Sequence, residues 1–235
     1  MRPSWKGPLL WGGRAVNAGA SWALGRKLVA VDQRRAWRRR AANWRAEVAA
    51  VEGDPYYAEL DARLVKTLAA LPSARRLLEV GCFTGYRLAK VRAALADALV
   101  LGLDMVFEAL RVGRDGASGA CRLVNGDAAH LPLRSGAVDC CYTIACLTHV
   151  PERRVGAVLD EMLRVARRYL VLIEVYDRLM RFRQRLRVWG WEGGYCHPYE
   201  ALLARRGLTP LRVEGLYDGA GHPRYTLFVY AKGSA

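Results

Sequence analysis

A short loop that contains two glycines constrains this chain more than any other feature. It reads Glu79-Val-Gly-Cys-Phe-Thr-Gly85, follows the apolar residues Leu77 and Leu78, and precedes a helical pattern over residues 86–95. Glycine lacks a Cβ and adopts positive φ readily, so such a loop lets backbone approach a ligand closely. The N-terminus of the next helix directs N–H groups and partial positive charge at the same place. The segment predicts a strand, a tight loop and a helix around a ligand.

Asp104 indicates what kind of ligand to expect. It follows a second apolar run, residues 98–103, and so falls at the tip of the next predicted strand. An acidic residue there can accept hydrogen bonds from both hydroxyls of a ribose. A dinucleotide needs glycine at the third and sixth positions of its loop, where this chain has Phe83 and Tyr86. The pattern therefore favours a cofactor with one nucleoside and no pyrophosphate.

The pattern Glu-x-Gly-x-x-x-Gly resembles motif I of the class I S-adenosylmethionine-dependent methyltransferases. Three later segments, 125–133, 137–152 and 161–174, are similar to the following motifs of that family, in the same order. The resemblance covers residues 75–176 well. Two departures are the missing Pro-Gly-Gly before the fifth strand and Phe83, where many relatives have glycine.

The expected fold class is α/β: a doubly wound, mostly parallel seven-stranded sheet with an antiparallel C-terminal strand, which is the Rossmann-like class I methyltransferase fold. Alternating strand and helix patterns agree with helices on both faces. A C-terminal pair of strands is expected over 209–217 and 224–231. We expect a basic helical extension over 1–72 and the methyltransferase domain over 73–235. The resemblance implies a helical insertion at 178–206, where relatives build a lid over the acceptor.

The resemblance implies S-adenosyl-L-methionine as the cofactor. The acidic residue of the loop after the third strand, Asp127, would then hold the adenine amino group. The full set of expected cofactor-binding residues is Glu79, Gly81, Cys82, Gly85, Asp104, Met105, Asp127, Ala128 and Thr143.

Candidates on the acceptor side are fewer. His149 follows the fourth strand, where relatives often carry a histidine that faces the cleft, and it is our candidate general base; a packing or helix-capping role is the alternative. A base helps only when the acceptor is a hydroxyl or a carbon acid. Tyr176, Tyr195 and His197 are candidate substrate residues. The acceptor molecule and its reacting atom stay open.

The N-terminal residues predict cationic amphipathic helices. Trp37, Ala41, Trp44, Val48 and Val51 recur at helical spacing, with arginines around them. A second helix is expected over 56–71, after a break at Gly53-Asp-Pro55. In the family such helices cap the cofactor cleft, so Tyr56 or Tyr57 would contact the cofactor or pack on the sheet.

Cysteine and histidine usage indicates neither a metal site nor a disulfide framework. Six cysteines and four histidines show no metal-ligand spacing. Cys140 and Cys141 fall in a predicted buried strand, where neighbours face opposite sides. Buried free thiols favour a reducing compartment. We expect a cytoplasmic protein without a membrane span, since the chain has no apolar run of about eighteen residues.

A net charge of +15 favours an anionic partner. Three hypotheses stay open. The first is an enzyme that acts on a small-molecule or lipid-like acceptor, with an anionic membrane surface as a further partner. The second is an RNA-modifying methyltransferase. The third is a non-catalytic module that docks on membrane or RNA through its basic helices. The sequence favours the first, because it carries no recognisable RNA-binding module, and it leaves the oligomeric state open.

Overall fold

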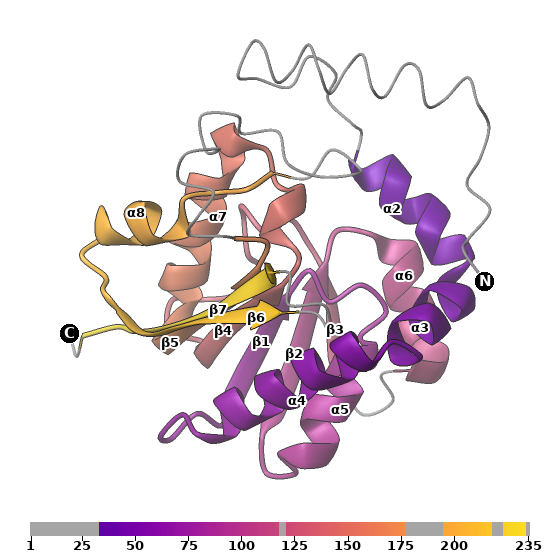
Figure 1. The fold of residues 1–235 in the computed structure, drawn as a ribbon. Coiled ribbons are helices and arrows are strands. Elements are labelled where there is room, and N and C mark those ends of the chain that lie inside the picture. The colour runs from indigo at the N-terminus through magenta and orange to yellow at the C-terminus, as the bar shows by residue number, and fades with distance from the viewer. Residues whose placement is uncertain (1–32, 118–120, 177–194, 218–222, 234–235) are drawn as a thin grey trace.

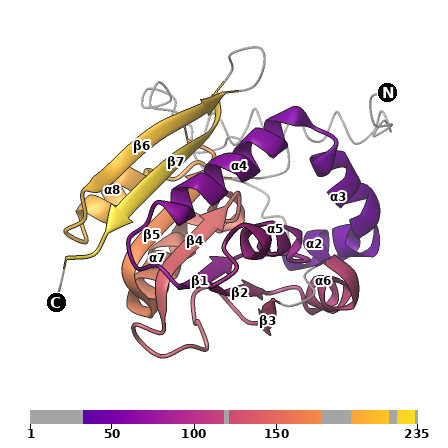
Figure 2. The same cartoon turned by 90° about the horizontal axis from the view of Figure 1, so that it is seen from below.

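The computed structural model describes residues 33–117, 121–176, 195–217 and 223–233 (Figures 1 and 2). Their centre is a seven-stranded sheet in the order β3-β2-β1-β4-β5-β7-β6. The strands are β1 (Arg76–Val80), β2 (Leu99–Asp104), β3 (Arg122–Asn125), β4 (Val138–Ile144), β5 (Ala166–Glu174), β6 (Pro210–Tyr217) and β7 (Pro223–Ala231).

Strand direction confirms the expected fold class. Every neighbouring pair from β3 to β5 is parallel, and β7 is antiparallel to both β5 and β6. The C-terminal strands begin within one residue of the predicted positions. A parallel sheet of this kind exposes ligand sites at the carboxyl ends of its strands, close to the point where the strand order reverses between β1 and β4.

Helices cover both faces of the sheet, as Figure 2 shows from below. The helices α4 (Pro55–Ala69) and α5 (Tyr86–Ala94) pack on one face, where their leucines meet Leu77 and Cys140. The helices α7 (Glu152–Val165) and α8 (Tyr199–Ala204) pack on the other, with Leu78 and Cys141. The adjacent cysteines therefore face opposite layers, as predicted.

The N-terminal helices differ from the single stripe expected over 37–51. The structure divides that stretch into α2 (Gln33–Ala42) and α3 (Trp44–Glu52), separated at Asn43. In Figures 1 and 2, α2 lies beside α6 (Phe107–Val112). The predicted break before α4 is confirmed. Asp54 is the N-cap of α4 and accepts a hydrogen bond from the Tyr56 amide at 2.9 Å, and Pro55 lies in the first turn.

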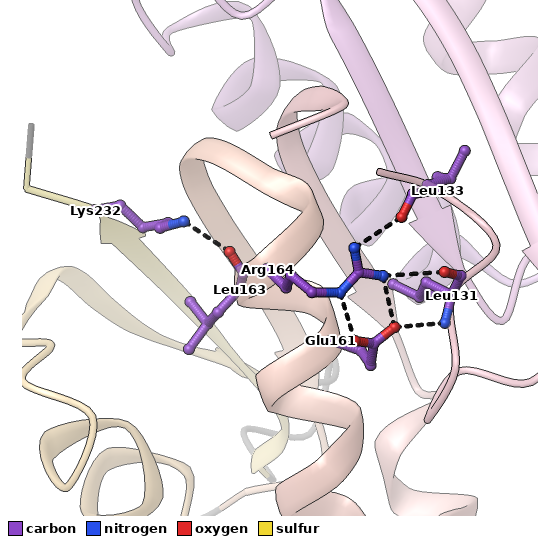
Figure 3. Close-up of polar contacts among 6 residues, drawn as sticks. All are labelled: Leu131, Leu133, Glu161, Leu163, Arg164 and Lys232. Atoms are coloured by element: carbon purple, nitrogen blue, oxygen red, sulfur yellow. Dashed lines mark hydrogen bonds and ion pairs between the residues drawn. The ribbon is translucent and has the colours of Figure 1, made fainter. Parts of the chain in front are cut away.

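Charged contacts on α7 fix the loop that follows β3 (Figure 3). The Arg164 guanidinium donates to the carbonyls of Leu133 and Leu131 at 2.8 and 3.0 Å and pairs with Glu161. Glu161 also accepts from the Leu131 amide at 2.7 Å. Lys232 donates to the Leu163 carbonyl at 2.7 Å, which satisfies a group at the end of the helix. This loop contains Asp127, so α7 supports one wall of the site described next.

The domain boundary at residue 72 and the acceptor lid stay predictions. Most of the proposed insertion lies outside the described residues, which resume at Tyr195. In the described part of the chain, no helix is long and apolar enough to cross a bilayer, and no cluster of residues suits a metal ion.

Candidate active site

A cavity of about 730 Å³ lies at the carboxyl ends of the central strands. Its wall includes the residues that follow β1, the end of β2 at Asp104, the loop after β3 at Asp127 and the residues after β4. Helices α2 and α3 complete it through Trp37 and Val48. A volume of this size suits a cofactor or a small ligand.

The loop after β1 has the backbone that its glycines predict. Gly81 has φ +81° and Gly85 has φ +73°, and the Gly81 amide donates to the Leu103 carbonyl at 2.7 Å. A Cβ on Gly81 would lie 2.3 Å from Sγ of Cys146. The loop therefore approaches the segment after β4 with no room for a side chain.

Phe83 explains the departure from the family pattern. Its φ is +53°, in the left-handed region that glycine occupies without steric cost. Its ring packs edge-on against Trp37 of α2, with the centroids 5.5 Å apart. The chain thus keeps the backbone conformation of a glycine at this position and uses the ring to hold α2.

Asp104 closes the loop after β1. Its two carboxylate oxygens accept from the amides of Phe83 and Val106, each at 2.8 Å. Burial raises the pKa of Asp104, and these backbone hydrogen bonds oppose the rise. A carboxylate offers about four acceptor positions, and the backbone contacts, which also include Met105, do not use all of them.

Glu79 lies on the cavity wall but is only 2 % exposed. Its carboxyl accepts from the Tyr142 hydroxyl at 3.3 Å. Burial raises the pKa of Glu79 to about 7, although the nearby charge of Arg87 acts against this. Arg87 itself pairs with Asp61 of α4 at 2.8 Å, which joins α5 to α4 beneath the cavity.

Asp127 is held from two sides. The Ala129 amide donates to it at 2.9 Å, and the guanidinium of Arg154, from α7, pairs with it at 2.6 Å. Partial burial acts to raise the pKa of Asp127, but these two contacts dominate and hold it below its ordinary value. The carboxylate therefore stays charged at neutral pH.

Aromatic contacts join α2 to the acceptor-side candidate His149. The rings of Trp37 and His149 meet edge to face with centroids 5.0 Å apart, and both residues line the cavity. Ala41, one turn later on α2, is buried against Val106 and Ala109. These contacts hold α2 against the site.

The segment that carries His149 is clamped by side chains on both sides. Glu174, at the end of β5, accepts from the amides of Cys146, Leu147 and Thr148 at 3.0 to 3.2 Å. His197 presents Nε2 to the Leu147 carbonyl at 3.0 Å, so this nitrogen carries the proton. The 3-10 turn η2 (Leu147–His149) is therefore fixed from β5 and from the residues before α8.

The cavity wall brings together eight of the predicted site residues: Glu79, Gly81, Cys82, Asp104, Met105, Asp127, Ala128 and His149. Tyr57 lines it as well, whereas Tyr56 is buried on α4.

Five predicted residues do not line the cavity: Gly85, Thr143, Tyr176, Tyr195 and His197. Gly85 is the N-cap of α5, and Thr143 donates to Glu174 at 2.6 Å. Tyr176 donates to Glu200 at 2.7 Å, and the Tyr195 amide donates to the Thr148 carbonyl at 2.6 Å. These positions support the frame of the site, so direct contact with cofactor or substrate stays a prediction.

Three residues of the site were missed from sequence. Trp37 was predicted to lie on the apolar stripe of a helix, but the pattern does not say which residues the stripe packs against. No sequence pattern around Arg154 indicates that it pairs with Asp127. Glu174 did carry a signal, because it is an acidic residue at the end of an apolar strand, as Asp104 is.

Comparison with known proteins identifies the centre of the chain. Residues 77–168 match a family described as a methyltransferase domain. The match covers less than half of the chain and supports a class I methyltransferase domain there. The cofactor of that family is S-adenosylmethionine.

A demethylmenaquinone methyltransferase of Roseiflexus castenholzii is 35% identical over 101 residues, which are 43% of this chain and 42% of that protein. The match thus spans less than half the length of this relative.

Solved structures share the fold of most of the chain. N-methyltransferase NodS from Bradyrhizobium japonicum, in complex with S-adenosyl-L-homocysteine, has a TM-score of 0.66 at 14% identity and covers 84% of this chain and 97% of its own. Magnesium protoporphyrin IX methyltransferase from Synechocystis, with bound S-adenosylmethionine, has a TM-score of 0.55 at 15% identity. The match covers 99% of this chain and 100% of that protein. At these identities the likeness establishes the fold.

The residues of the cavity fit this cofactor. The position of Gly81 has no space for a Cβ, so backbone alone lines the wall there. Asp104 keeps acceptor positions for ribose hydroxyls, and Asp127 is a charged acceptor on the same wall. Acceptors of the required kind therefore come from the ends of successive strands.

Proposed function

We propose that this chain is an S-adenosylmethionine-dependent methyltransferase that acts on a small-molecule or lipid-like acceptor. The observation that carries the proposal is the convergence of Glu79, Gly81, Asp104 and Asp127 on one cavity of about 730 Å³. These residues come from three different strand ends, and together they provide what a nucleoside with a charged tail needs.

When bound, the cofactor supplies a methyl group activated by a sulfonium, which an acceptor nucleophile takes by in-line displacement. The chain's task is to hold the two reactants in line and to exclude water. Positioning of this kind alone lowers a barrier by several kcal/mol, up to about 7–11 in the best cases. Asp104 and Asp127 would hold the nucleoside, while Trp37 and the segment around His149 would bound the acceptor side.

His149 is the group on the wall best placed to take a proton. Its segment is fixed by Glu174 and His197, so its ring has a defined place beside Trp37. A hydroxyl or carbon acceptor would use this base, whereas an amine or thiolate acceptor would need only orientation.

Small or lipid-like acceptors agree with the names of similar proteins, which include a demethylmenaquinone methyltransferase and a magnesium protoporphyrin IX methyltransferase. The wall formed by α2 and α3 includes the apolar side chains of Trp37, Val48 and Val51, which suit the apolar part of such a molecule.

Calorimetric titration with S-adenosylmethionine, S-adenosylhomocysteine and NAD tests the proposal. We expect the two sulfur nucleosides to bind at micromolar concentration and NAD not to bind. Asp104→Ala should weaken binding roughly 10- to 100-fold, since a hydrogen bond to a charged group contributes about 1.5–3 kcal/mol. Asp97→Ala, at a position whose side chain is 89% exposed, is the matched control and should leave affinity unchanged.

Circular dichroism must show that Asp104→Ala remains folded. Undiminished affinity in a folded Asp104→Ala protein would remove this residue from the site. Tight binding of NAD, or of neither sulfur nucleoside, would overturn the cofactor assignment.

A further inference from the structure

Helix α2 carries more positive charge than its own folding requires. Its ten residues include five arginines and no acid. Arg34 and Arg38, like Arg35 and Arg39, are four residues apart, and like charges at that spacing destabilise a helix. All four of these side chains are exposed. The stability of the helix itself therefore does not explain this charge.

The inner face of α2 is held by the rest of the protein, which fixes where the arginines lie. Ala41 is buried against α6, and Trp37 packs on Phe83 and His149. Arg38 forms an exposed ion pair with Glu108 at 2.6 Å. Together with the exposed Arg35 and Arg39, it gives a cationic outer surface to a helix whose orientation is set.

The same helix forms part of the cavity wall. Arg34 and Trp37 line the cavity, while Arg35 and Arg39 do not. Beside this surface, Phe107 is 58% exposed and directly precedes Glu108, the partner of Arg38. A cationic helix face with an exposed apolar side chain next to it is the combination that binds an anionic lipid interface.

We propose that this surface, Arg35, Arg38 and Arg39 with Phe107 beside them, docks on an anionic lipid surface. The α2 wall of the cavity then lies at the bilayer, where a lipid-like acceptor would be found. Surfaces for single-stranded nucleic acid pair such charge with aromatic side chains that stack on successive bases. Trp37 is turned inward, which leaves Phe107 as the exposed ring of this surface. One ring cannot stack on successive bases, so the observations favour lipid. Docking itself is independent of the proposed function; only the access of the acceptor rests on it.

Sedimentation with phospholipid vesicles tests the proposal on the full chain. We expect binding to vesicles of phosphatidylglycerol mixed with phosphatidylcholine, little binding to phosphatidylcholine alone, and a fall in binding as salt rises. The double variant Arg35→Gln/Arg39→Gln should bind roughly 25-fold more weakly, because each basic side chain near an anionic surface contributes about a fivefold factor in affinity.

The matched control is Arg167→Gln/Arg168→Gln, an exposed arginine pair at the start of β5 and so at the opposite end of the strands. It removes the same charge and should bind vesicles nearly as well as the native protein. Phe107→Ser should weaken the binding that persists at high salt.

Three outcomes would overturn the proposal. One is equal binding to neutral and anionic vesicles. Another is an equal loss, or no loss, in the two double variants. The third is a single-stranded RNA oligonucleotide that binds through Arg35 and Arg39 while vesicles do not. Titration of each variant with S-adenosylmethionine separates this result from the proposed function. Cofactor binding without vesicle binding would contradict only the docking proposal. Vesicle binding without cofactor binding would contradict only the proposed enzymatic function.

Discussion

Gly81 and Cys146 come so close that a single methyl group on the glycine would lie 2.3 Å from the cysteine sulfur. Gly81 belongs to the loop after β1, and Cys146 to the segment after β4 that leads to His149. This contact makes the cofactor wall and the acceptor wall one packed unit. A shift in either loop must therefore move the other.

Gly81→Ala should disturb both walls. Alanine at φ +81° costs about 1–2 kcal/mol, and the clash adds about 1–3 kcal/mol of overpacking. Gly136→Ala is the matched control, because its φ is +63° and nothing lies within 4 Å of the new methyl group. Urea unfolding should show a larger loss for Gly81→Ala, and calorimetry should show lost cofactor affinity in that variant alone. Equal losses of stability in the two variants would mean that backbone strain, rather than the contact with Cys146, causes the effect of Gly81→Ala.

The backbone and the ring of Phe83 contribute separately to stability, and two substitutions can distinguish them. Phe83→Ala and Phe83→Gly both remove the contact with Trp37, but only alanine retains the cost of a positive φ. We expect Phe83→Gly to be the more stable of the two by about 1 kcal/mol in urea unfolding. A Phe83→Ala protein as stable as Phe83→Gly would contradict the role of the left-handed backbone.

Glu79 should make stability depend on pH. Its pKa is about 7 in the folded protein and near 4.5 in the unfolded chain, because folding buries the carboxyl. Between these values the folded state binds the proton more tightly, so stability is greatest below about pH 4.5 and is lost as pH rises through 7. For a fully buried group the loss is on the order of 3 kcal/mol.

The comparison with Glu79→Gln isolates this contribution, since glutamine cannot titrate and can still accept from Tyr142. Unfolding free energies measured across pH 4.5 to 7 should fall more steeply in the native protein than in the variant. Glu174, whose pKa burial also raises to about 7, stays in both proteins and so cancels. Parallel curves would show that Glu79 does not carry the shift.

Glu174 should matter more than any single hydrogen bond suggests. Glu174→Ala leaves three buried amides, those of Cys146, Leu147 and Thr148, without their acceptor, at about 1–3 kcal/mol each. Thr143→Val removes only the hydroxyl donor and should cost about 1 kcal/mol. Amide hydrogen exchange at the three residues should accelerate in Glu174→Ala and stay slow in Thr143→Val. Slow exchange in both variants would show that Glu174 does not hold the segment in place.

The sequence predicted the strands well, and it predicted where two of them end at the cavity wall. The apolar run before Glu79 and the apolar run before Asp104 are local patterns, and local patterns decide where a strand ends. The glycines at 81 and 85 likewise predict their own backbone conformation, since few other residues adopt it. The carboxyl ends of parallel strands must then meet at one edge of the sheet.

The acceptor side could not be predicted in the same way. Tyr176 and His197 were chosen for their residue type and position in the chain, but the structure uses them to bond Glu200 and the Leu147 carbonyl. Their partners are 24 and 50 residues away, beyond the reach of any periodic pattern.

By itself, then, the sequence determined the fold and the strand ends that meet at the cavity, because strand ends and glycine turns depend on neighbouring residues. Only the tertiary structure decided that Trp37 packs on Phe83 and His149, and that Arg154 pairs with Asp127. These contacts join segments that are far apart in the chain, and their geometry is fixed only when the sheet brings those segments together.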